Sequence, residues 1–399
     1  MNHIDFKGKK VIMRVDFNVP LDENFNVTDD TRISSAIPTI KAILEKGASV
    51  ILMSHLGRPL KKLKDDGSIN VKKFTLKHII PVLSEHLGQE VTFIDDCLGD
   101  EAKKKSEQIT EGEVVLLENT RFYPGEEKGD KDMAKQLADL GDIYINDAFG
   151  TAHRAHASTA VIAQFFTKEN KGFGYLMDSE LENAKKVTEN PQRPFTAIIG
   201  GAKVSDKMLL LERLSEIADN VIVGGGMAYT FMKAKGGKTG NSLVEDDRIE
   251  LAKKLWDSGK GATFHLPEDS NCADAFSNDA QRATHDSMEI PDGWMGLDIG
   301  PEAIKQFSEV ILKSKTILWN GPMGVFEMSH FASGTKTIAE KVAEATKNGA
   351  YSLVGGGDSV AAVTQMDLAD DVSFVSTGGG AMLELLEGKD LPGVAAIRE

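Results

Sequence analysis

The chain of 399 residues has 41% hydrophobic and 27% charged residues, a globular composition in a chain too long for one ordinary core, so two domains are expected. A net charge of −15 argues against nucleic-acid and acidic-membrane partners and leaves small molecules as the expected ligands. With two cysteines, no apolar signal segment and no stretch long enough to span a bilayer, the chain is expected to be a cytoplasmic enzyme without a disulfide framework.

The first half alternates short apolar runs with helical patterns. Its runs are KKVIMRVDFN, ASVILMSHLG, EVTFIDD, GEVVLLENTRF and DIYINDAFG. Near-continuous Val, Ile and Leu are typical of strands covered on both faces. Between them, segment 34–46 places Ile37, Ile40 and Leu44 on one helical face. This alternation predicts a parallel, doubly wound sheet.

Two segments carry specific helix predictions. Pro81 interrupts the helical pattern of residues 75–88, and we expect a late helix start or a kink there. Residues 172–189 predict a helix that connects two dissimilar halves, with Leu181, Ala184 and Val187 at helical spacing. Ser179 and Glu182 have the spacing of a capping box and predict its start.

The second half repeats the layout with FTAIIGGAK, NVIVGGG, TILWNGPMG, AYSLVGGGDS and VSFVSTGGG. Each run ends in glycines and leads into a helical pattern. The predicted fold class is therefore α/β, with two doubly wound parallel-sheet (Rossmann-like) domains joined by a helix and a cleft between them.

Ligands of open parallel sheets bind beyond the carboxyl ends of the strands, which turns the strand ends into candidate sites. In the first half the rule selects Asp16, Asn18, His55, Arg58, Arg121, Asn146 and Asp147, with Arg32 and Arg154 in nearby loops. A single arginine is usually a solvated surface residue, but four at one sheet edge favour a compact polyanion. The HRAH segment lacks the glutamate of a zinc-protease motif, so His153 and His156 are interpreted as structural.

In the second half the same rule selects glycine-rich turns. They are Gly200, Gly201 and Lys203 with Lys207 a turn later, then Gly224–Gly226, Asn320–Gly324, Gly355–Ser359 and Gly378–Gly380. Glycines before helices let backbone N–H groups approach an anion, and several along one edge favour a nucleotide. Asp358 is the best candidate ligand for Mg²⁺, and Glu327 could accept from ribose hydroxyls.

The same residues argue against three alternative classes of protein. The segment GGAKVSDK does not match the P-loop motif, and no glycine cluster completes G-x-G-x-x-G after the first strand, as a nicotinamide dehydrogenase would require. A non-catalytic nucleotide-binding protein would be expected to lose charged residues, yet Arg32, Lys203 and Asp358 are present.

Nine motifs resemble the phosphoglycerate kinase family, in that family's order and across almost the entire chain. They are RVDFNVPL, MSHLGRP, LLENTRFYPGEEK, NDAFGTAHRAHAS, GGAKVSDK, GWMGLDIGP, WNGPMGVFE, GGGDS and STGGGAMLELLEG. The resemblance implies a monomeric, cytoplasmic glycolytic kinase. It would transfer a phosphoryl group reversibly between 1,3-bisphosphoglycerate with ADP and 3-phosphoglycerate with ATP, using Mg²⁺.

The resemblance also implies site residues and domain bounds. The phosphoglycerate site would comprise Asp16, Phe17, Asn18, Arg32, His55, Leu56, Gly57, Arg58, Arg121 and Arg154. The nucleotide site would comprise Gly201, Lys207, Gly224, Gly225, Gly296, Asn320, Pro322, Glu327, Gly356, Gly357, Asp358 and Ser359, with Asp358 as metal ligand. The domains would be residues 1–172, a connecting helix at 173–189, residues 190–378, and a tail at 379–399 that returns to the first domain.

Arg32, Lys203, Gly378 and Gly379 would face the migrating phosphoryl group. The attacking oxygen is ionised in both directions, so no general base is needed. We hypothesise that the 172–189 helix and the 378–380 turn act as hinge elements that bring the substrates together. Gly172, Gly174 and the triglycine could absorb the dihedral changes.

Overall fold

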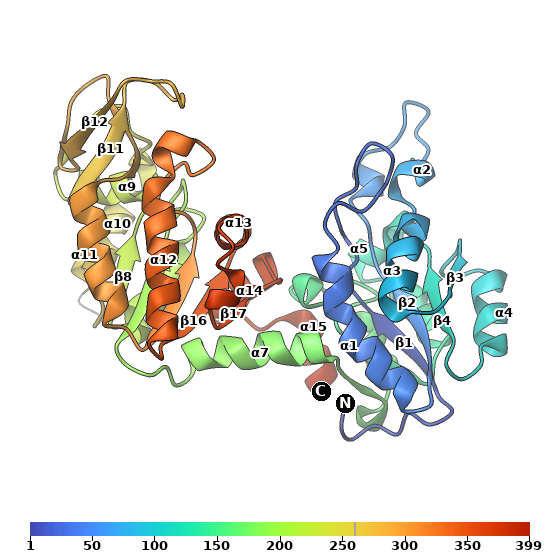
Figure 1. The fold of residues 1–399 in the computed structure, drawn as a ribbon. Coiled ribbons are helices and arrows are strands. Elements are labelled where there is room, and N and C mark those ends of the chain that lie inside the picture. Colours follow the sequence, from blue (N-terminus) through green and yellow to red (C-terminus); the bar gives the residue numbers. More distant parts are fainter. Residues whose placement is uncertain (259–260) are drawn as a thin grey trace. The chain divides into compact units, whose positions relative to one another are not determined.

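The computed structural model describes residues 1–258 and 261–399 (Figure 1). It divides into two compact units, which we call unit 1 (Met1–Leu181 with Asp390–Glu399) and unit 2 (Glu182–Lys389). The chain therefore passes from one unit to the other twice, first within helix α7 (Tyr175–Thr188) and again after Lys389.

Unit 1 is built on a six-stranded parallel sheet of order β3-β4-β2-β1-β5-β6. Its strands are β1 (Lys10–Arg14), β2 (Ser49–Met53), β3 (Val91–Ile94), β4 (Val114–Leu117), β5 (Ile143–Asn146) and β6 (Lys171–Phe173). Its helices are α1 (Thr31–Glu45), α2 (Val71–Phe74), α3 (Ile80–Leu87), α4 (Asp100–Gln108), α5 (Pro124–Lys128), α6 (Lys131–Ala138) and α15 (Pro392–Arg398).

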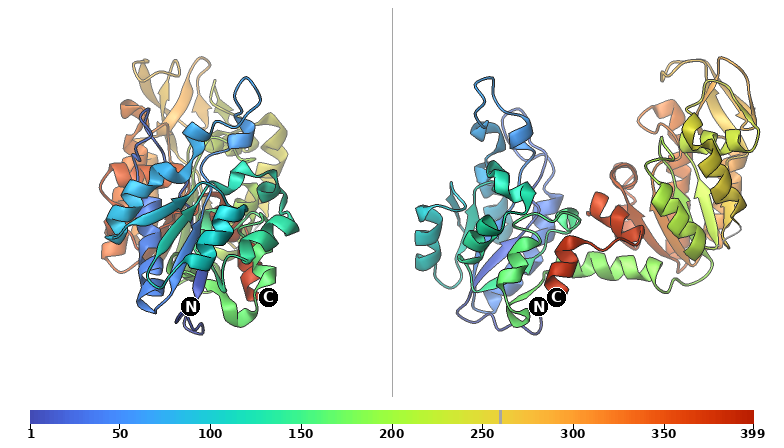
Figure 2. Two further views of the ribbon diagram at one scale, coloured as in Figure 1. Left: turned by 90° about the vertical axis from the view of Figure 1, so that its right-hand side faces the viewer. Right: turned by 180° about the vertical axis from the view of Figure 1, so that it is seen from behind.

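Consecutive residues of the central strands enter two different hydrophobic cores. Met13 of β1 packs in the core that α1 and α3 cover, whereas its neighbour Ile12 packs in the core that contains residues of α6 and α15. Figure 2 shows helices on both faces of this sheet. Because a strand exposes alternate side chains to opposite faces, strands covered on both sides must be apolar throughout, as the sequence indicates.

The helix predictions have mixed outcomes. Residues 76–79 form a 3₁₀ turn and α3 begins at Ile80, so the expected late start at Pro81 is confirmed. Helix α7 begins at Tyr175, four residues before Ser179, so the capping-box start was wrong. The first turn is instead bound by side chains distant in sequence. Tyr175 N donates to Thr39 Oγ1 at 2.9 Å, and Met177 N donates to Asp147 Oδ1 at 3.1 Å.

Unit 2 contains a second six-stranded parallel sheet, of order β10-β8-β7-β15-β16-β17. Its strands are β7 (Phe195–Ile199), β8 (Asn220–Val223), β10 (Thr263–His265), β15 (Thr316–Asn320), β16 (Tyr351–Gly355) and β17 (Phe374–Val375). Its helices are α8 (Met208–Ile217), α9 (Met227–Ala234), α10 (Ile249–Asp257), α11 (Pro301–Leu312), α12 (Ser333–Lys347), α13 (Gly357–Gln365) and α14 (Gly380–Leu386).

Unit 2 also contains a small antiparallel sheet of order β12-β11-β14, which the sequence did not predict. It comprises β11 (Asp269–Ala273), β12 (Arg282–Asp286) and β14 (Met295–Ile299), and a short parallel pair, β9 (Lys238–Thr239) with β13 (Glu289–Ile290), lies in the same part of the chain. The predicted fold class, two helix-flanked parallel sheets, is confirmed. None of the helices among the described residues has the length and apolar run that a bilayer crossing needs.

Candidate active site

The carboxyl ends of the unit 1 strands carry a hydrogen-bonded chain of predicted site residues. Arg32 Nη1 donates to Asn18 O at 2.9 Å and lies 3.3 Å from Asp16 Oδ1. Asn18 Oδ1 accepts from Gly57 N at 2.8 Å, and Gly57 O accepts from Arg121 Nη1 at 2.9 Å. These contacts bring the loops after β1, β2 and β4 and the first turn of α1 into one cluster.

Phe17, Leu56 and Gly57 contribute mainly through their backbone. Phe17 N donates to Ser54 Oγ at 2.8 Å, and Leu56 O accepts from Asn119 Nδ2 at 2.8 Å. Gly57 has a φ of +63°, and a Cβ there would lie 2.7 Å from the Phe74 ring. Glycine is therefore required at this turn both by conformation and by packing.

Arg14 is a residue of this cluster that the sequence reasoning missed. It is the last residue of β1, its side chain is fully buried, and its Nη2 lies 3.1 Å from His55 Nδ1. The RVDFN motif contains this arginine, but the strand-end rule selected only residues that follow the strand, beginning with Asp16.

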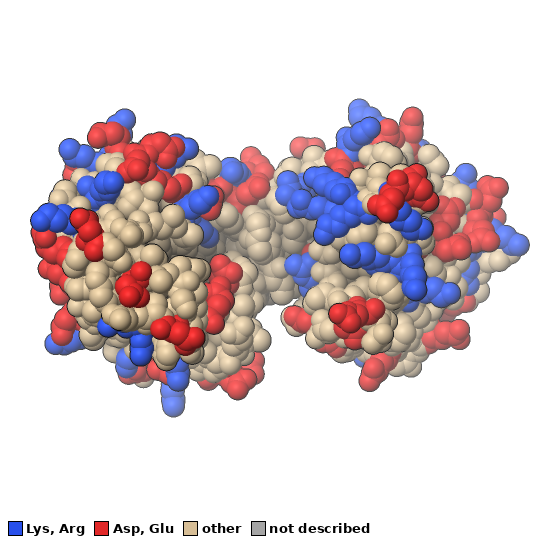
Figure 3. Space-filling model, turned by 90° about the horizontal axis from the view of Figure 1, so that it is seen from above, with Lys and Arg blue, Asp and Glu red and all other residues tan. Residues whose placement is uncertain are grey.

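The remaining cationic residues surround the same edge. Burial is the largest cause that lowers the pKa of Arg121. The charge of Arg14 lowers it further, and so does the charge of Arg58. Burial is the largest cause that lowers the pKa of His156 to about 4, followed by Arg121 and Arg14, with Arg154 also acting on it. Each of these groups resists a further positive charge nearby, so the cluster favours an anion. Figure 3 shows Lys and Arg side chains gathered on the face of unit 1 turned toward the viewer.

All predicted unit 1 site residues thus lie at one edge. Arg58 and Arg154 are exposed, whereas His55 is buried. Asn146 is fully buried and its Nδ2 donates to Thr159 O at 3.1 Å, so it supports the loop after β5.

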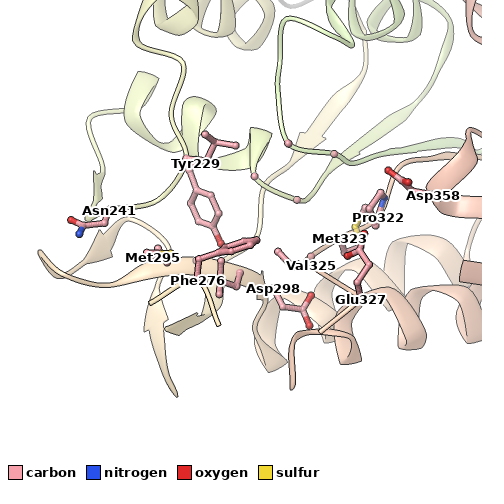
Figure 4. Close-up of a pocket in the computed structure, with 18 residues that line it drawn as sticks. Tyr229, Asn241, Phe276, Met295, Asp298, Pro322, Met323, Val325, Glu327 and Asp358 are labelled. Atoms are coloured by element: carbon pink, nitrogen blue, oxygen red, sulfur yellow. The ribbon is translucent and has the colours of Figure 1, made fainter. Parts of the chain in front are cut away.

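Unit 2 contains a cavity of about 470 Å³. Six predicted nucleotide-site residues line it: Gly201, Gly225, Gly296, Pro322, Glu327 and Asp358. Figure 4 places Tyr229, Phe276 and Met295 at one end of the cavity and Pro322, Met323 and Asp358 at the other. One end is therefore mainly apolar and aromatic, and the other carries the glycine turns and a carboxylate.

The glycine turns are packed backbone against backbone. A Cβ on Gly225, whose φ is +71°, would lie 2.5 Å from Gly201 O, and one on Gly200 would lie 2.0 Å from Pro322 O. A Cβ on Gly224 would lie 2.4 Å from the Met323 sulfur. These glycines are therefore needed for close contact among three loops, in addition to any contact with a ligand.

Other predicted residues support the cavity without lining it. Lys207 Nζ donates to Asn320 Oδ1, and burial lowers the pKa of Lys207. Ser359 Oγ accepts from Gly321 N at 2.5 Å. Gly356, with a φ of +90°, precedes Gly357, the first residue of α13, and Asp358 lies in the first turn of that helix.

Three of the residues expected to face the migrating group lie in loops of unit 2. Lys203 is exposed in the loop after β7. Gly378 N donates to Ser376 Oγ at 3.1 Å, and Gly379, with a φ of +49°, directly precedes α14.

The apolar end of the cavity was missed because much of it comes from outside the parallel strands. Tyr229 lies on α9, while Phe276 and Met295 belong to the antiparallel β11–β14 region. Phe276 is 64% exposed, an unusual position for phenylalanine that a pattern search alone does not reveal. Asp298 also lines the cavity, and burial raises its pKa to about 7.

Comparisons with known proteins agree over the whole chain. The family model described as phosphoglycerate kinase matches residues 1–389. A phosphoglycerate kinase of Porphyromonas gingivalis is 50% identical, covering 100% of this chain and 99% of its own length. A cytosolic one of Nicotiana tabacum is 52% identical, covering 100% and 97%.

Solved structures give the same result. The phosphoglycerate kinase of Coxiella burnetii matches with a TM-score of 0.89 and 39% identity, covering 100% of this chain and 98% of that one. That of Pyrococcus horikoshii OT3 matches with a TM-score of 0.82 and 30% identity over the same shares. By its sequence, its fold and the residues gathered at its two sheet edges, the chain belongs to the phosphoglycerate kinase family.

Proposed function

We propose that the protein catalyses reversible phosphoryl transfer between 1,3-bisphosphoglycerate and ADP, yielding 3-phosphoglycerate and ATP in glycolysis. The observation that carries the proposal is a pair of anion-binding arrangements, one per unit. Unit 1 gathers guanidinium groups around Asp16 and His55, and unit 2 surrounds a cavity with glycine turns and a helix start.

The phosphoglycerate would bind in unit 1. Arg32, Arg58, Arg121 and Arg154 would hold its phosphate and carboxylate, because guanidinium groups bind such anions with two parallel hydrogen bonds. The Asp16–Arg32 and Gly57–Arg121 contacts support this proposal, since they orient two of the four side chains before any ligand arrives. Preorganised donors lose less entropy on binding than mobile ones.

The nucleotide would bind in the unit 2 cavity. Its base would lie at the end lined by Tyr229, Phe276 and Gly296, its ribose near Glu327, and its phosphates near Gly201 and the start of α13. The amide-bearing start of a helix attracts phosphate through its dipole. Lys207, at the neighbouring Asn320, would add a positive charge.

Asp358 would hold the Mg²⁺ ion that accompanies the nucleotide. Residues 1–258 and 261–399 contain no group of three or more His, Cys, Asp or Glu side chains arranged to bind a metal. A single carboxylate on the cavity wall fits Mg²⁺, which binds through one or two carboxylates and completes its shell with phosphates and water. When bound, the ion neutralises charge on the phosphate oxygens.

Transfer itself would need positioning rather than proton transfer. Arg32 and Lys203 would offset charge on the migrating group, and the amides of Gly378 and Gly379 would donate to its oxygens.

The reacting atoms must come within roughly 3–3.5 Å. Because the two substrates are assigned to different units, we propose that the units approach in the ternary complex. Small-angle scattering with each ligand and then both tests this, and unchanged dimensions would contradict it.

A coupled assay tests the proposed activity. The protein is incubated with 3-phosphoglycerate, ATP and Mg²⁺, and ADP release is followed, with reactions lacking 3-phosphoglycerate as the control. Acceptor-dependent ADP release is expected. Nucleotide binding without turnover would favour a non-catalytic protein instead.

We further propose that the enzyme acts as a cytoplasmic monomer on small molecules. Relatives named as cytosolic enzymes support this, although a chloroplastic relative of Arabidopsis thaliana is equally similar, at 52% identity. Light scattering during size-exclusion chromatography should give a mass near 43.2 kDa, and twice that mass would contradict the monomer.

A further inference from the structure

Behind the unit 1 site lies a buried chain of polar groups. Glu126, on α5, accepts through Oε1 from Ser158 N at 3.0 Å and from Ser158 Oγ at 2.9 Å. Ser158 Oγ in turn accepts from Arg14 Nε at 2.8 Å. Arg14 Nη1 donates to Val15 O, and its Nη2 lies 3.1 Å from His55 Nδ1. Glu126, Ser158 and Arg14 are all fully buried.

The donors and acceptors of these groups fix the direction of each hydrogen bond in the series. A guanidinium has only donors, so the His55 nitrogen beside Arg14 Nη2 must be the acceptor. The hydroxyl of Ser158 accepts a hydrogen bond from Arg14 Nε and donates its own to Glu126 Oε1. A neutral imidazole carries one proton, which must then be on Nε2 of His55.

The charges around His55 act in the same direction. Burial lowers the pKa of His55 well below its ordinary value, and Arg14, Arg121, Arg32 and His156 lower it further. An imidazolium would also place an N–H on Nδ1, facing the donor of Arg14. Geometry and charge therefore both oppose protonation at this position.

We propose that Glu126, Ser158 and Arg14 are positioning residues that hold His55 as its neutral Nε2–H tautomer, so that His55 offers the phosphoglycerate a hydrogen-bond donor without a charge. The part that concerns the substrate rests on the proposed function. The part that concerns the tautomer does not, since it is a property of the protein without ligand.

The test is long-range proton–nitrogen NMR of the uniformly labelled full chain without substrate, with the His55 signals assigned from a His55→Gln variant. Nδ1 is expected to lack a proton and Nε2 to carry one across about pH 6–8, where an ordinary histidine titrates. A His55 that carries its proton on Nδ1, or that becomes charged within this range, overturns the proposal. This measurement requires no mutation in the chain of positioning residues.

Ser158→Ala tests the positioning role of the hydrogen-bonded series Glu126, Ser158 and Arg14. It removes the oxygen between Arg14 and Glu126, so both tautomers should appear, and the KM for 3-phosphoglycerate should rise about fivefold to tenfold with little change in kcat or in the KM for ATP. Ser106→Ala is the matched control, because Ser106 is also buried and donates to Leu140 O at 2.6 Å outside this chain. It should leave the His55 spectrum and both KM values unchanged.

The outcomes separate the two proposals. A Ser158→Ala protein with the wild-type tautomer and KM overturns the positioning role, and if this variant does not fold, the wild-type spectrum still decides the tautomer. A wild-type protein that has the Nε2–H tautomer but no activity with 3-phosphoglycerate contradicts the proposed function and leaves the tautomer standing.

Discussion

The two units use similar sheets to build different candidate anion sites. In unit 1 the site consists of side chains, with Arg32 and Arg121 oriented by loop carbonyls. In unit 2 it consists largely of backbone, where Gly225 lies so close to Gly201 that a Cβ on Gly225 would be 2.5 Å from Gly201 O. The two sites should therefore respond differently to substitution. Removing a side chain should damage recognition in unit 1, whereas adding one should damage the structure of unit 2.

The largest effect is expected from Arg32→Ala. Loss of the charge that we propose to face the migrating group should lower kcat by about 10²–10³-fold while the Kd for ATP stays nearly unchanged. Arg193→Ala is the control, because Arg193 is an exposed arginine of unit 2 that pairs with Asp219 at 2.7 Å and should change kcat by less than about twofold. Steady-state kinetics and nucleotide titration measure both variants. Full activity of Arg32→Ala would remove Arg32 from the transfer step.

Gly225→Ala should break the backbone contacts of unit 2. The new methyl would lie 2.5 Å from Gly201 O at a φ of +71°, and we expect a loss of about 2–4 kcal/mol in the free energy of unfolding. Gly236→Ala separates the cost of conformation from the cost of contact. The φ of Gly236 is +86°, but a Cβ there would meet nothing within 4 Å. This substitution should lower the free energy of unfolding by about 1 kcal/mol.

Urea denaturation followed by tryptophan fluorescence measures these two glycine variants. All three tryptophans, Trp256, Trp294 and Trp319, belong to unit 2, so the signal reports that unit alone. Equal costs for the two substitutions would show that the close contact with Gly201 is unimportant.

Asp147→Asn should change the pH dependence of unit 1. Burial is the largest cause that raises the pKa of Asp147 from 3.8 to about 7, opposed by hydrogen bonds from Thr39, Met177 and Leu176. Because the folded state then holds this proton more tightly than the unfolded state, the contribution of Asp147 to stability falls as the pH rises from about 4 to about 7.

The asparagine keeps the oxygen that binds Met177 N and cannot titrate. Relative to the wild type, the variant should therefore gain about 2–3 kcal/mol between pH 5 and pH 8. Hydrogen exchange of β5 and α7 amides, compared between the two proteins at each pH, measures this difference. A constant difference would contradict the raised pKa.

The smallest effect is expected from Tyr229→Phe. The ring that lines the cavity remains, and only the hydroxyl that donates to Ser270 Oγ at 2.9 Å is lost. We expect the KM for ATP to rise about twofold to threefold. A loss as large as that of Arg32→Ala would show that unit 2 also depends on a single side chain, and the contrast between the units would fail.

The sequence predicted the sheets well because their signal is local. Strands such as β1 and β15 are apolar at every position since both faces are covered, and the glycines and charged residues that follow them mark the ligand edge. The rule that ligands bind beyond the strand ends then selected residues such as Arg121 and Asp358, and motif matching assigned their roles.

Features that depend on distant contacts were not predictable in this way. The start of α7 is set by Thr39 and Asp147, neither of which is near it in sequence. Gly174 was assigned to a hinge for its conformational freedom, which stays a prediction, and the sequence did not show that a Cβ there would also lie 2.2 Å from the Asp147 carboxylate. The buried guanidinium of Arg14 binds Ser158 and His55, which come from other segments.

Residues 390–399 determine the order in which the two units are synthesised during translation. Helix α15 belongs to unit 1, where Ile397 packs in the core that contains residues of β1, and Ala396 O accepts from Lys171 Nζ at 2.8 Å. The ribosome therefore finishes every residue of unit 2 before it supplies the final piece of unit 1. Although domains generally fold in order from the amino terminus, here the amino-terminal unit receives α15 only after unit 2 has been synthesised.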